Sequence, residues 1–413
     1  MKGKRSIRRE ALMYAAVAGP GLVTALAGNG ASGITTYSVV GSRFGLSLVW
    51  VLVASTVSLV VFLEMSARMG VVTGKGLASL IRERFGLRLT FFAMSVLLVA
   101  NIATTVAELA GIAASLELFG LSKYLTVPAI AGFIWVLVTR GSFNKVEKVF
   151  LGMCLIQVCY LVSGFMARPD WAQVAFSVVK PEISFDTTYL IAATAIVGTT
   201  VAPWMPFFVQ ANVVDKGIGI SDYRYQRADV ITGTVLANAI SLFIIMCTAF
   251  TLFPLGRTVE TAKQAALALA PLAGANATWL FGLGLFGAAV LSASVIPVST
   301  SYAMCEAFGW ESGIGRKLSM APMFFGVYTS SILLGVVVVL IPGVSLIGII
   351  MLTQVLNGIL LPVILVFMLK IVNDPGIMGD HVNGPVMNAI AWVTACGVIV
   401  TSLVLLVTGL FAI

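Results

Sequence analysis

The sequence contains very little charge and almost no histidine. Only 10% of its 413 residues are charged, and a single histidine, His381, is present. Soluble domains carry roughly 25% charged residues, whereas the mean hydropathy here is +1.03. These values exclude a soluble globular domain and predict a polytopic membrane protein. Its apolar runs are continuous and about 20 residues long, so we expect spanning helices rather than the strands of a barrel.

The sequence also lacks the patterns of enzymes and of cofactor-binding proteins. No nucleophile–base pair, glycine-rich nucleotide loop or metal-ligand cluster is present, so we expect no enzymatic activity and no cofactor. The net charge of +8 sits in loops beside the apolar segments, which indicates membrane topology and lipid contact rather than nucleic-acid binding. No obligate protein partner is indicated. The cysteines lie in or beside apolar segments and are expected to be free thiols: Cys154, Cys159, Cys247, Cys305 and Cys396.

Eleven apolar segments are predicted to span the bilayer. With the N-terminus inside, the cytoplasmic segments carry 19 of the Lys and Arg residues and the outside loops carry 6. The positive-inside rule therefore predicts a cell (inner) membrane protein with a cytoplasmic N-terminus and an outside C-terminus. A short amphipathic helix is expected on the outer face over 257–275. The segments cover approximately 13–40, 46–70, 91–118, 124–139, 147–166, 187–214, 227–254, 278–304, 318–341, 344–370 and 386–411.

Two of these segments contain breaks at equivalent positions. The first is interrupted by Gly28, Asn29, Gly30, Ala31, Ser32 and Gly33, and the sixth contains Ala202, Pro203 and Trp204 followed by Pro206. Glycine weakens a helix and proline removes a backbone donor. Such breaks survive at bilayer depth only where protein buries them or where they line a cavity. Paired interrupted helices predict an inverted-repeat transporter with its substrate site at the midplane.

The domain organisation follows from this pairing. We expect one transporter domain over 1–413, all-α, with a first repeat of five helices (1–166), a second repeat of five helices (187–371) and an eleventh helix (386–411). Two breaks at matching positions argue for alternating access rather than a channel. The chain has no room for the signalling domain that a non-transporting sensor would need.

At several motifs the chain resembles the Nramp family of proton-coupled divalent-metal transporters. The similar motifs are Gly19-Pro20-Gly21, the segment 67–75, Lys145-Val146-Glu147-Lys148, and Gln354-Val355-Leu356-Asn357 followed by Leu361-Pro362. Gly33-Ile34-Thr35-Thr36-Tyr37 and Ala202-Pro203-Trp204-Met205 look like the Nramp-related branch that includes magnesium transporters. The resemblance covers nearly the whole length and implies the LeuT-type fold.

The metal-binding motifs of the family are replaced here. The Asp-Pro-Gly-Asn motif of the first span falls on Gly30-Ala31-Ser32-Gly33, and the second acidic position of the magnesium-type branch falls on Gly28. The Met-Pro-His motif of the sixth span becomes Ala202-Pro203-Trp204. A carboxylate, a thioether and a histidine are therefore missing at these positions.

The altered site favours an anion over a cation as the transported ion. Asn29, Ser32, Gln354 and Asn357 offer no formal charge to a divalent ion, whereas half-helix N-termini present free N–H groups to an anion. The sequence therefore predicts a secondary-active transporter of a small anion such as bicarbonate. A divalent metal ion (Mg²⁺ or Mn²⁺) is the alternative. A neutral or zwitterionic solute and the loss of transport also remain open.

Either Na⁺ or H⁺ is expected to be the coupling ion. Glu108 lies within the third span and is the candidate proton carrier. Ser299 and Thr300 resemble the sodium site of LeuT-type transporters, although hydroxyls in spans also serve helix packing. Glu64 is four residues before Arg68, which predicts an ion pair on one helix.

Overall fold

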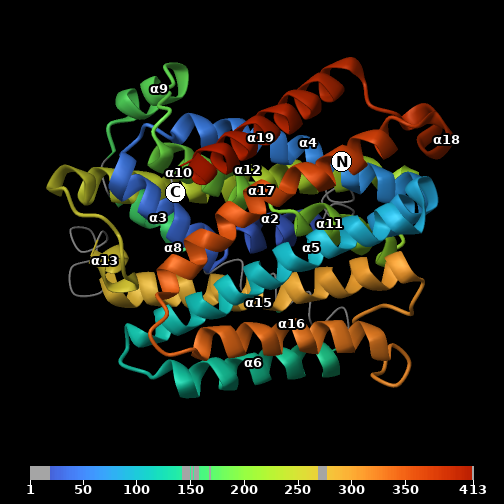
Figure 1. Cartoon of the computed structure of the whole chain (residues 1–413), viewed down its shortest axis with the longest axis horizontal. Coiled ribbons are helices and arrows are strands. Elements are labelled where there is room, and N and C mark those ends of the chain that lie inside the picture. Colours follow the sequence, from blue (N-terminus) through green and yellow to red (C-terminus); the bar gives the residue numbers. More distant parts are fainter. Residues whose placement is uncertain are drawn as a thin grey trace, which may run out of the picture.

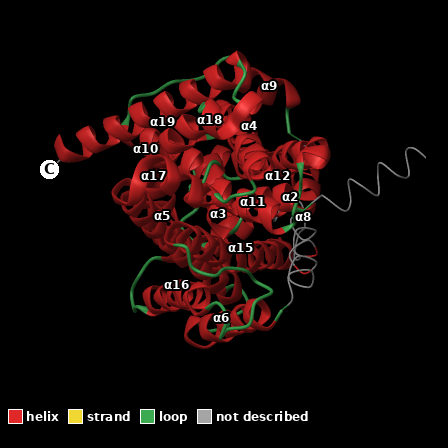
Figure 2. Ribbon diagram, turned by 90° about the vertical axis from the view of Figure 1, so that its right-hand side faces the viewer, coloured by secondary structure: helices red, strands yellow, loops and turns green. Residues whose placement is uncertain are grey.

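The described part of the chain is a bundle of helices stacked in layers. A computed structural model describes residues 19–141, 149, 152, 158–166, 169–267 and 277–411. In these residues every regular element is a helix (Figures 1 and 2). Helices α6 and α16 lie side by side at one edge of the bundle, and α4 and α19 lie at the other. The layers between them contain α5 and α15, and then the short helices α2, α3, α10 and α11 together with α12 and α17.

Helix bounds agree with the predicted spans to within a few residues in most cases. Eight described helices or helix pairs are long and apolar enough to cross a membrane. The elements are α2 (Pro20–Gly28), α3 (Ala31–Phe44), α4 (Val49–Thr73), α5 (Leu77–Glu117), α6 (Lys123–Arg140), α8 (Val158–Met166), α9 (Trp171–Val179), α10 (Thr187–Thr200), α11 (Trp204–Asp215), α12 (Tyr223–Thr251), α13 (Ala262–Leu267), α15 (Ala277–Phe308), α16 (Pro322–Leu340), α17 (Leu346–Val372), α18 (Pro375–Met378) and α19 (Pro385–Phe411), with short 3-10 turns at Ile220–Asp222, Phe253–Leu255 and Gly379–His381.

Some local features differ from the sequence-based expectation. Helix α5 begins at Leu77 rather than near 91, because a short helix precedes Gly86, whose φ of 75° interrupts the helical geometry. Helix α9 was not predicted; Asp170 caps its N-terminus by accepting from the N–H of Ala172 at 3.0 Å. The amphipathic helix expected over 257–275 is seen only as α13, and 268–276 lie outside the described residues. Of the predicted fifth span, 149, 152 and 158–166 are described, the last as α8.

The structure separates the charged residues into two ends. One end, called the basic end below, is built around the Arg68 guanidinium, which lies 3.3 Å from Glu64 and donates to the carbonyl of His381 at 2.7 Å. Arg84 pairs there with Asp374 at 2.6 Å. At the opposite end, Lys123 donates to the carbonyl of Val339 at 2.9 Å. The predicted Glu64–Arg68 pair is therefore confirmed, and the predicted cytoplasmic segments in the described residues share the basic end.

Glycine lets helix backbones touch at two important contacts. A Cβ at Gly198 in α10 would lie 2.5 Å from the backbone nitrogen of Gly358 in α17, closer than real Cβ contacts come. A Cβ at Gly21 in α2 would lie 2.6 Å from the Cα of Val230 in α12. The buried Asp229 carboxylate of α12 also accepts from the N–H of Gly21 at 2.7 Å and from that of Gly19 at 3.2 Å. These contacts fix α2 against α12 and α10 against α17.

Candidate functional site

The first helix break lies where the sequence predicts it, between α2 and α3. Helix α2 ends at Gly28, and Gly30 has an extended backbone (φ −63°, ψ −168°) before α3 begins at Ala31. The hydroxyl of Ser292 in α15 donates to the freed carbonyl of Ala27. Protein groups therefore replace water for this break, as a polar backbone at membrane depth requires.

The second break lies between α10 and α11. Helix α10 ends at Thr200, and α11 begins at Trp204 directly after Pro203. Pro203 has no N–H, and a proline just before the first helical turn costs no intrahelical bond. Ser299 of α15 donates to the carbonyl of Trp204 at 3.0 Å. Helix α15 thus supports both breaks, with Ser292 at the first and Ser299 at the second.

The Glu108 carboxylate of α5 occupies the N-terminus of α3. It accepts from the N–H of Ala31 at 2.7 Å, from the N–H of Ser32 at 3.3 Å and from the Ser32 hydroxyl. Its side chain has no exposed surface. Because the first N–H groups of a helix have no intrahelical partner and carry partial positive charge, this position suits a carboxylate. At the first break, the N–H donors expected to meet an anionic substrate are therefore already bonded to a carboxylate of the protein.

The carboxylate and the thioether that the break sequences lack are supplied by residues elsewhere in the chain. A Cβ at Gly30 would lie 2.6 Å from the Cδ of Glu108, so the carboxylate fills the space that a side chain at 30 would take. A Cβ at Gly28 would overlap the Met205 side chain and lie 3.6 Å from its sulfur. Sequence comparison alone shows the loss of a carboxylate and a thioether. The structure brings a carboxylate from α5 to Gly30 and a thioether from α11 to Gly28.

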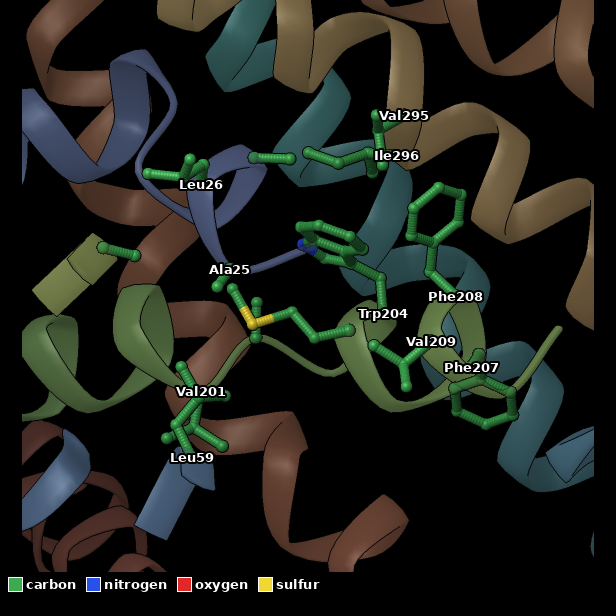
Figure 3. Close-up of a cluster of buried hydrophobic side chains, with 14 of the residues drawn as sticks. Ala25, Leu26, Leu59, Val201, Trp204, Phe207, Phe208, Val209, Val295 and Ile296 are labelled. Atoms are coloured by element: carbon green, nitrogen blue, oxygen red, sulfur yellow. The ribbon is translucent and has the colours of Figure 1, made fainter. Parts of the chain in front are cut away.

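The remaining predicted residues divide into two groups. The indole of Trp204 is buried and packs edge-to-face on Phe208, with ring centroids 6.0 Å apart, and it extends toward the α2 segment that carries Ala25 and Leu26 (Figure 3). The Asn29 side chain instead donates to the carbonyl of Ala237 and accepts from Ser241 at 2.9 Å, so it holds α2 to α12.

Gln354 and Asn357 of α17 and Thr300 of α15 lie against α5, although the Gln354 carbonyl also touches Gly198 near the end of α10. Asn357 donates to Thr104 at 2.8 Å, and Thr300 accepts from Asn101 at 2.9 Å. The structure therefore separates the predicted site residues of α15. Ser299 lies at a break and Thr300 lies in this second group.

The site is buried and is closed at the basic end. Gln210 of α11 donates to the carbonyl of Lys75 at 2.8 Å, Tyr302 donates to Asp215, and Tyr223 donates to Glu64. At the opposite end a cavity of about 770 Å³ is lined by residues of α5, α13, α15 and α17 and their loops, among them Ala114, Lys123 and Ser345. Ala114 lies one turn beyond Gly111, where α5 packs on Ala31, so the cavity approaches the first break from this end.

Comparison with known proteins gives a consistent family relation. The family model described as "Natural resistance-associated macrophage protein-like" (Nramp) matches residues 21–408. The divalent metal cation transporter MntH of Granulibacter bethesdensis is 27% identical over 413 residues, covering 94% of this chain and 88% of the relative. MntH of Erwinia tasmaniensis is also 27% identical and covers 93% and 92%.

Solved structures share the fold. The manganese transporter of Eremococcus coleocola superposes with a TM-score of 0.76 at 22% identity, covering 96% of this chain and 86% of that one. MhsT, solved with L-phenylalanine, gives a TM-score of 0.62 at 14% identity and covers 95% and 98%. Mhp1, a nucleobase–cation symporter, gives 0.61. These likenesses confirm the predicted LeuT-type architecture with interrupted first and sixth helices.

Proposed function

The chain belongs to the Nramp family of secondary transporters, and on that premise we propose that its substrate is a divalent metal ion of the Mn²⁺ class. The ion would bind at the two helix breaks, between Glu108 and Met205, and cross by alternating access. The named relatives are divalent metal cation transporters, and this fits the alternative that the sequence left open. Bicarbonate, the main sequence-based prediction, has no support from them.

The observation that carries this proposal is the place of the Glu108 carboxylate. It fills the N-terminus of α3, which is where an anion would otherwise find N–H donors. An anionic substrate would have to displace this carboxylate and then lie beside its charge. A cation gains from the same charge, since a carboxylate oxygen is a ligand that divalent ions accept. The charge balance of the site therefore favours a cation.

The Met205 thioether supports a transition metal within the divalent class. Its sulfur lies against Gly28 on one side of the break, and Glu108 lies against Gly30, two residues along. Soft sulfur ligands favour transition metals over Mg²⁺, which prefers oxygen and keeps several waters. A site with one carboxylate, one thioether and backbone carbonyls would bind Mn²⁺ better than Mg²⁺.

The orientation and coupling belong to the same proposal. Grouping of the Arg68, Lys75 and Arg84 side chains at one end supports placing that end in the cytoplasm of the cell. The large cavity would then open outward, and the closed basic end would open inward during the cycle. Because the Glu108 carboxylate is both buried and bonded to a half-helix, it remains the candidate for carrying a proton.

Uptake into proteoliposomes tests the proposal. We expect saturable Mn²⁺ uptake by the full chain, measured with an entrapped metal-sensitive dye, and no uptake of isotopically labelled bicarbonate. Glu108→Gln should lower uptake by at least about tenfold because it removes the charge at the site. Glu311→Gln is the control, since Glu311 pairs with Arg316 on the exposed surface. Bicarbonate uptake without Mn²⁺ uptake would overturn the proposal.

A further inference from the structure

A second buried polar group lies along α5, with partners on α15 and α17. We call it the amide cluster and define it by Asn101, Thr104, Thr300, Gln354 and Asn357. All five side chains are buried, and Asn357 has no exposed surface. Helix α5 packs on α15 on one side of it and on α17 on the other. None of these residues carries a formal charge.

The amide cluster is joined by hydrogen bonds from its amide nitrogens and hydroxyls. The Asn101 amide donates to Thr300 at 2.9 Å, and the Asn357 amide donates to Thr104 at 2.8 Å. The Thr104 hydroxyl donates to the carbonyl of Ala100 at 2.8 Å, and the Thr300 hydroxyl donates to the carbonyl of Ile296 at 2.9 Å. Each hydroxyl proton is thus directed to its own helix. The hydroxyl protons are therefore not directed at a ligand between the helices, and the hydroxyl oxygens face it with lone pairs.

Two amide oxygens have no donor among the described residues. These are the Oδ1 atoms of Asn101 and Asn357. A buried carbonyl oxygen without a partner is costly, and apolar side chains of similar size would avoid that cost. Natural structures keep such groups where an ion, a water or a function uses them. Two of them, on residues that bond to neighbouring turns of α5 and α15, indicate a ligand that accepts lone pairs, which is a cation.

The chemistry of the cluster selects the class of cation. Its ligands are amide and hydroxyl oxygens, which bind hard cations. A divalent ion out of water needs carboxylates, and the cluster has none. Asn101, Thr104 and Glu108 follow one face of α5, and the seven residues from Asn101 to Glu108 span about 10 Å along the axis. The Glu108 carboxylate thus lies close enough to favour one extra positive charge.

From this geometry we propose that the amide cluster is a binding site for a monovalent cation of sodium size. Its ligands are Oδ1 of Asn101 and of Asn357, with the Thr300 and Thr104 hydroxyl oxygens beside them. The site lies between the helix breaks and the basic end, on three helices rather than at a broken one. It differs from the site expected at Ser299, because the Ser299 hydroxyl is bonded to the carbonyl of Trp204.

Thermal unfolding of the purified full chain tests the site without any transport measurement. In detergent and without divalent metal, replacing choline chloride by NaCl at equal ionic strength should raise Tm by roughly 3 °C at saturating Na⁺. The double variant Asn101→Leu with Asn357→Leu should fold and lose this Na⁺ shift. Asn238→Leu is the control, since Asn238 is a buried asparagine of α12 that donates within its own helix at 3.0 Å.

The outcomes separate this proposal from the proposed metal substrate. A Na⁺ shift in the wild-type protein and the control, but not in the double variant, supports the site. No shift in the wild-type protein overturns it and assigns the two oxygens to a water. An equal shift in the double variant also overturns it, because Na⁺ would then bind elsewhere. If the double variant fails to fold, Asn357→Asp is measured in its place. Its carboxylate should lower the half-saturating Na⁺ concentration about tenfold. Neither failure bears on Mn²⁺ uptake.

Discussion

Replacing Gly30 by alanine should disable the transport site while leaving the backbone relaxed. At φ −63° and ψ −168° an alanine is unstrained, so its effect comes from space alone. The new Cβ would lie 2.6 Å from the Cδ of Glu108, whereas ordinary Cβ contacts are 3.4–4 Å. The carboxylate must therefore move by about 1 Å and give up its bonds to the N–H groups of Ala31 and Ser32. The Ser292 hydroxyl, which the new Cβ would also overlap, must turn away from the carbonyl of Ala27.

The size of the effect follows from those bonds. Hydrogen bonds to a charged group contribute about 1.5–3 kcal/mol each, so losing two costs about 3–6 kcal/mol. We expect Gly30→Ala to lower both Tm and Mn²⁺ uptake, the latter by more than about 100-fold. Gly132→Ala is the matched control, because a Cβ at Gly132 in α6 meets nothing within 4 Å. The readouts are Tm by differential scanning fluorimetry and uptake into proteoliposomes.

A double variant that exchanges the two side chains separates the steric effect from the loss of charge. Gly30→Asp combined with Glu108→Ala returns one carboxylate to the first break and removes the overlap with Glu108, so that only the Ser292 hydroxyl, which a Cβ at Gly30 also meets, still has to rotate away. This double variant should recover uptake to within about tenfold of the wild-type protein. If Gly30→Ala alone keeps wild-type Tm and uptake, the carboxylate does not occupy the N-terminus of α3, and the reasoning from Glu108 to a cation fails.

Three further perturbations test other parts of the structure. Met205→Leu should weaken the binding of Mn²⁺ and Cd²⁺ more than that of Mg²⁺ in competition uptake, because it removes the sulfur and keeps the side-chain volume. Equal losses for all three ions would contradict a thioether ligand. The buried Met94 of α5 provides the control, Met94→Leu. Gly198→Ala should severely reduce the yield of folded protein, because the new Cβ would overlap the carbonyl of Gln354. The yield is measured by size-exclusion chromatography, and a normal yield would refute the close contact between α10 and α17. Asp186 caps α10, and its hydrogen bond from the Thr188 hydroxyl holds the pKa of the carboxyl below its usual range. The ionised carboxylate therefore stabilises the fold above its unfolded pKa, and this contribution is lost as pH falls through the folded pKa. The difference in Tm between the wild-type protein and Asp186→Ala should shrink over that pH range. A difference that stays constant would argue against the cap.

The fold could be predicted from the sequence because its signals are local. Each span is a continuous apolar run, and both breaks are marked by glycine or proline within a few residues. Charge in the loops then separates the two ends. The short helix before Gly86 and helix α9 were missed because they are brief and depend on caps and neighbours rather than on a long apolar run.

The chemistry of the site could not be predicted because it depends on distant residues. Gly28 and Gly30 show that two side chains are missing but not what fills the space. Glu108 was singled out as a buried acid, yet only packing of α5 on α3 reveals that it caps a half-helix. The one local signal for the thioether is that Met205 follows Trp204 directly in the sequence. Asn29 has a ligand's chemistry, but its side chain is bonded to α12.

The fastening of α2 by Asp229 has a mechanical consequence for the transport cycle. The carboxylate holds the N–H groups of Gly19 and Gly21 at the very start of α2, and the backbones of α2 and α12 touch without side chains between them. Pulling the two helices apart would leave a buried carboxylate short of donors, which is a large penalty. Separating α2 from α12 is therefore costly, and because α12 also packs on α3 beyond the break, one long helix ties together both halves of the interrupted one.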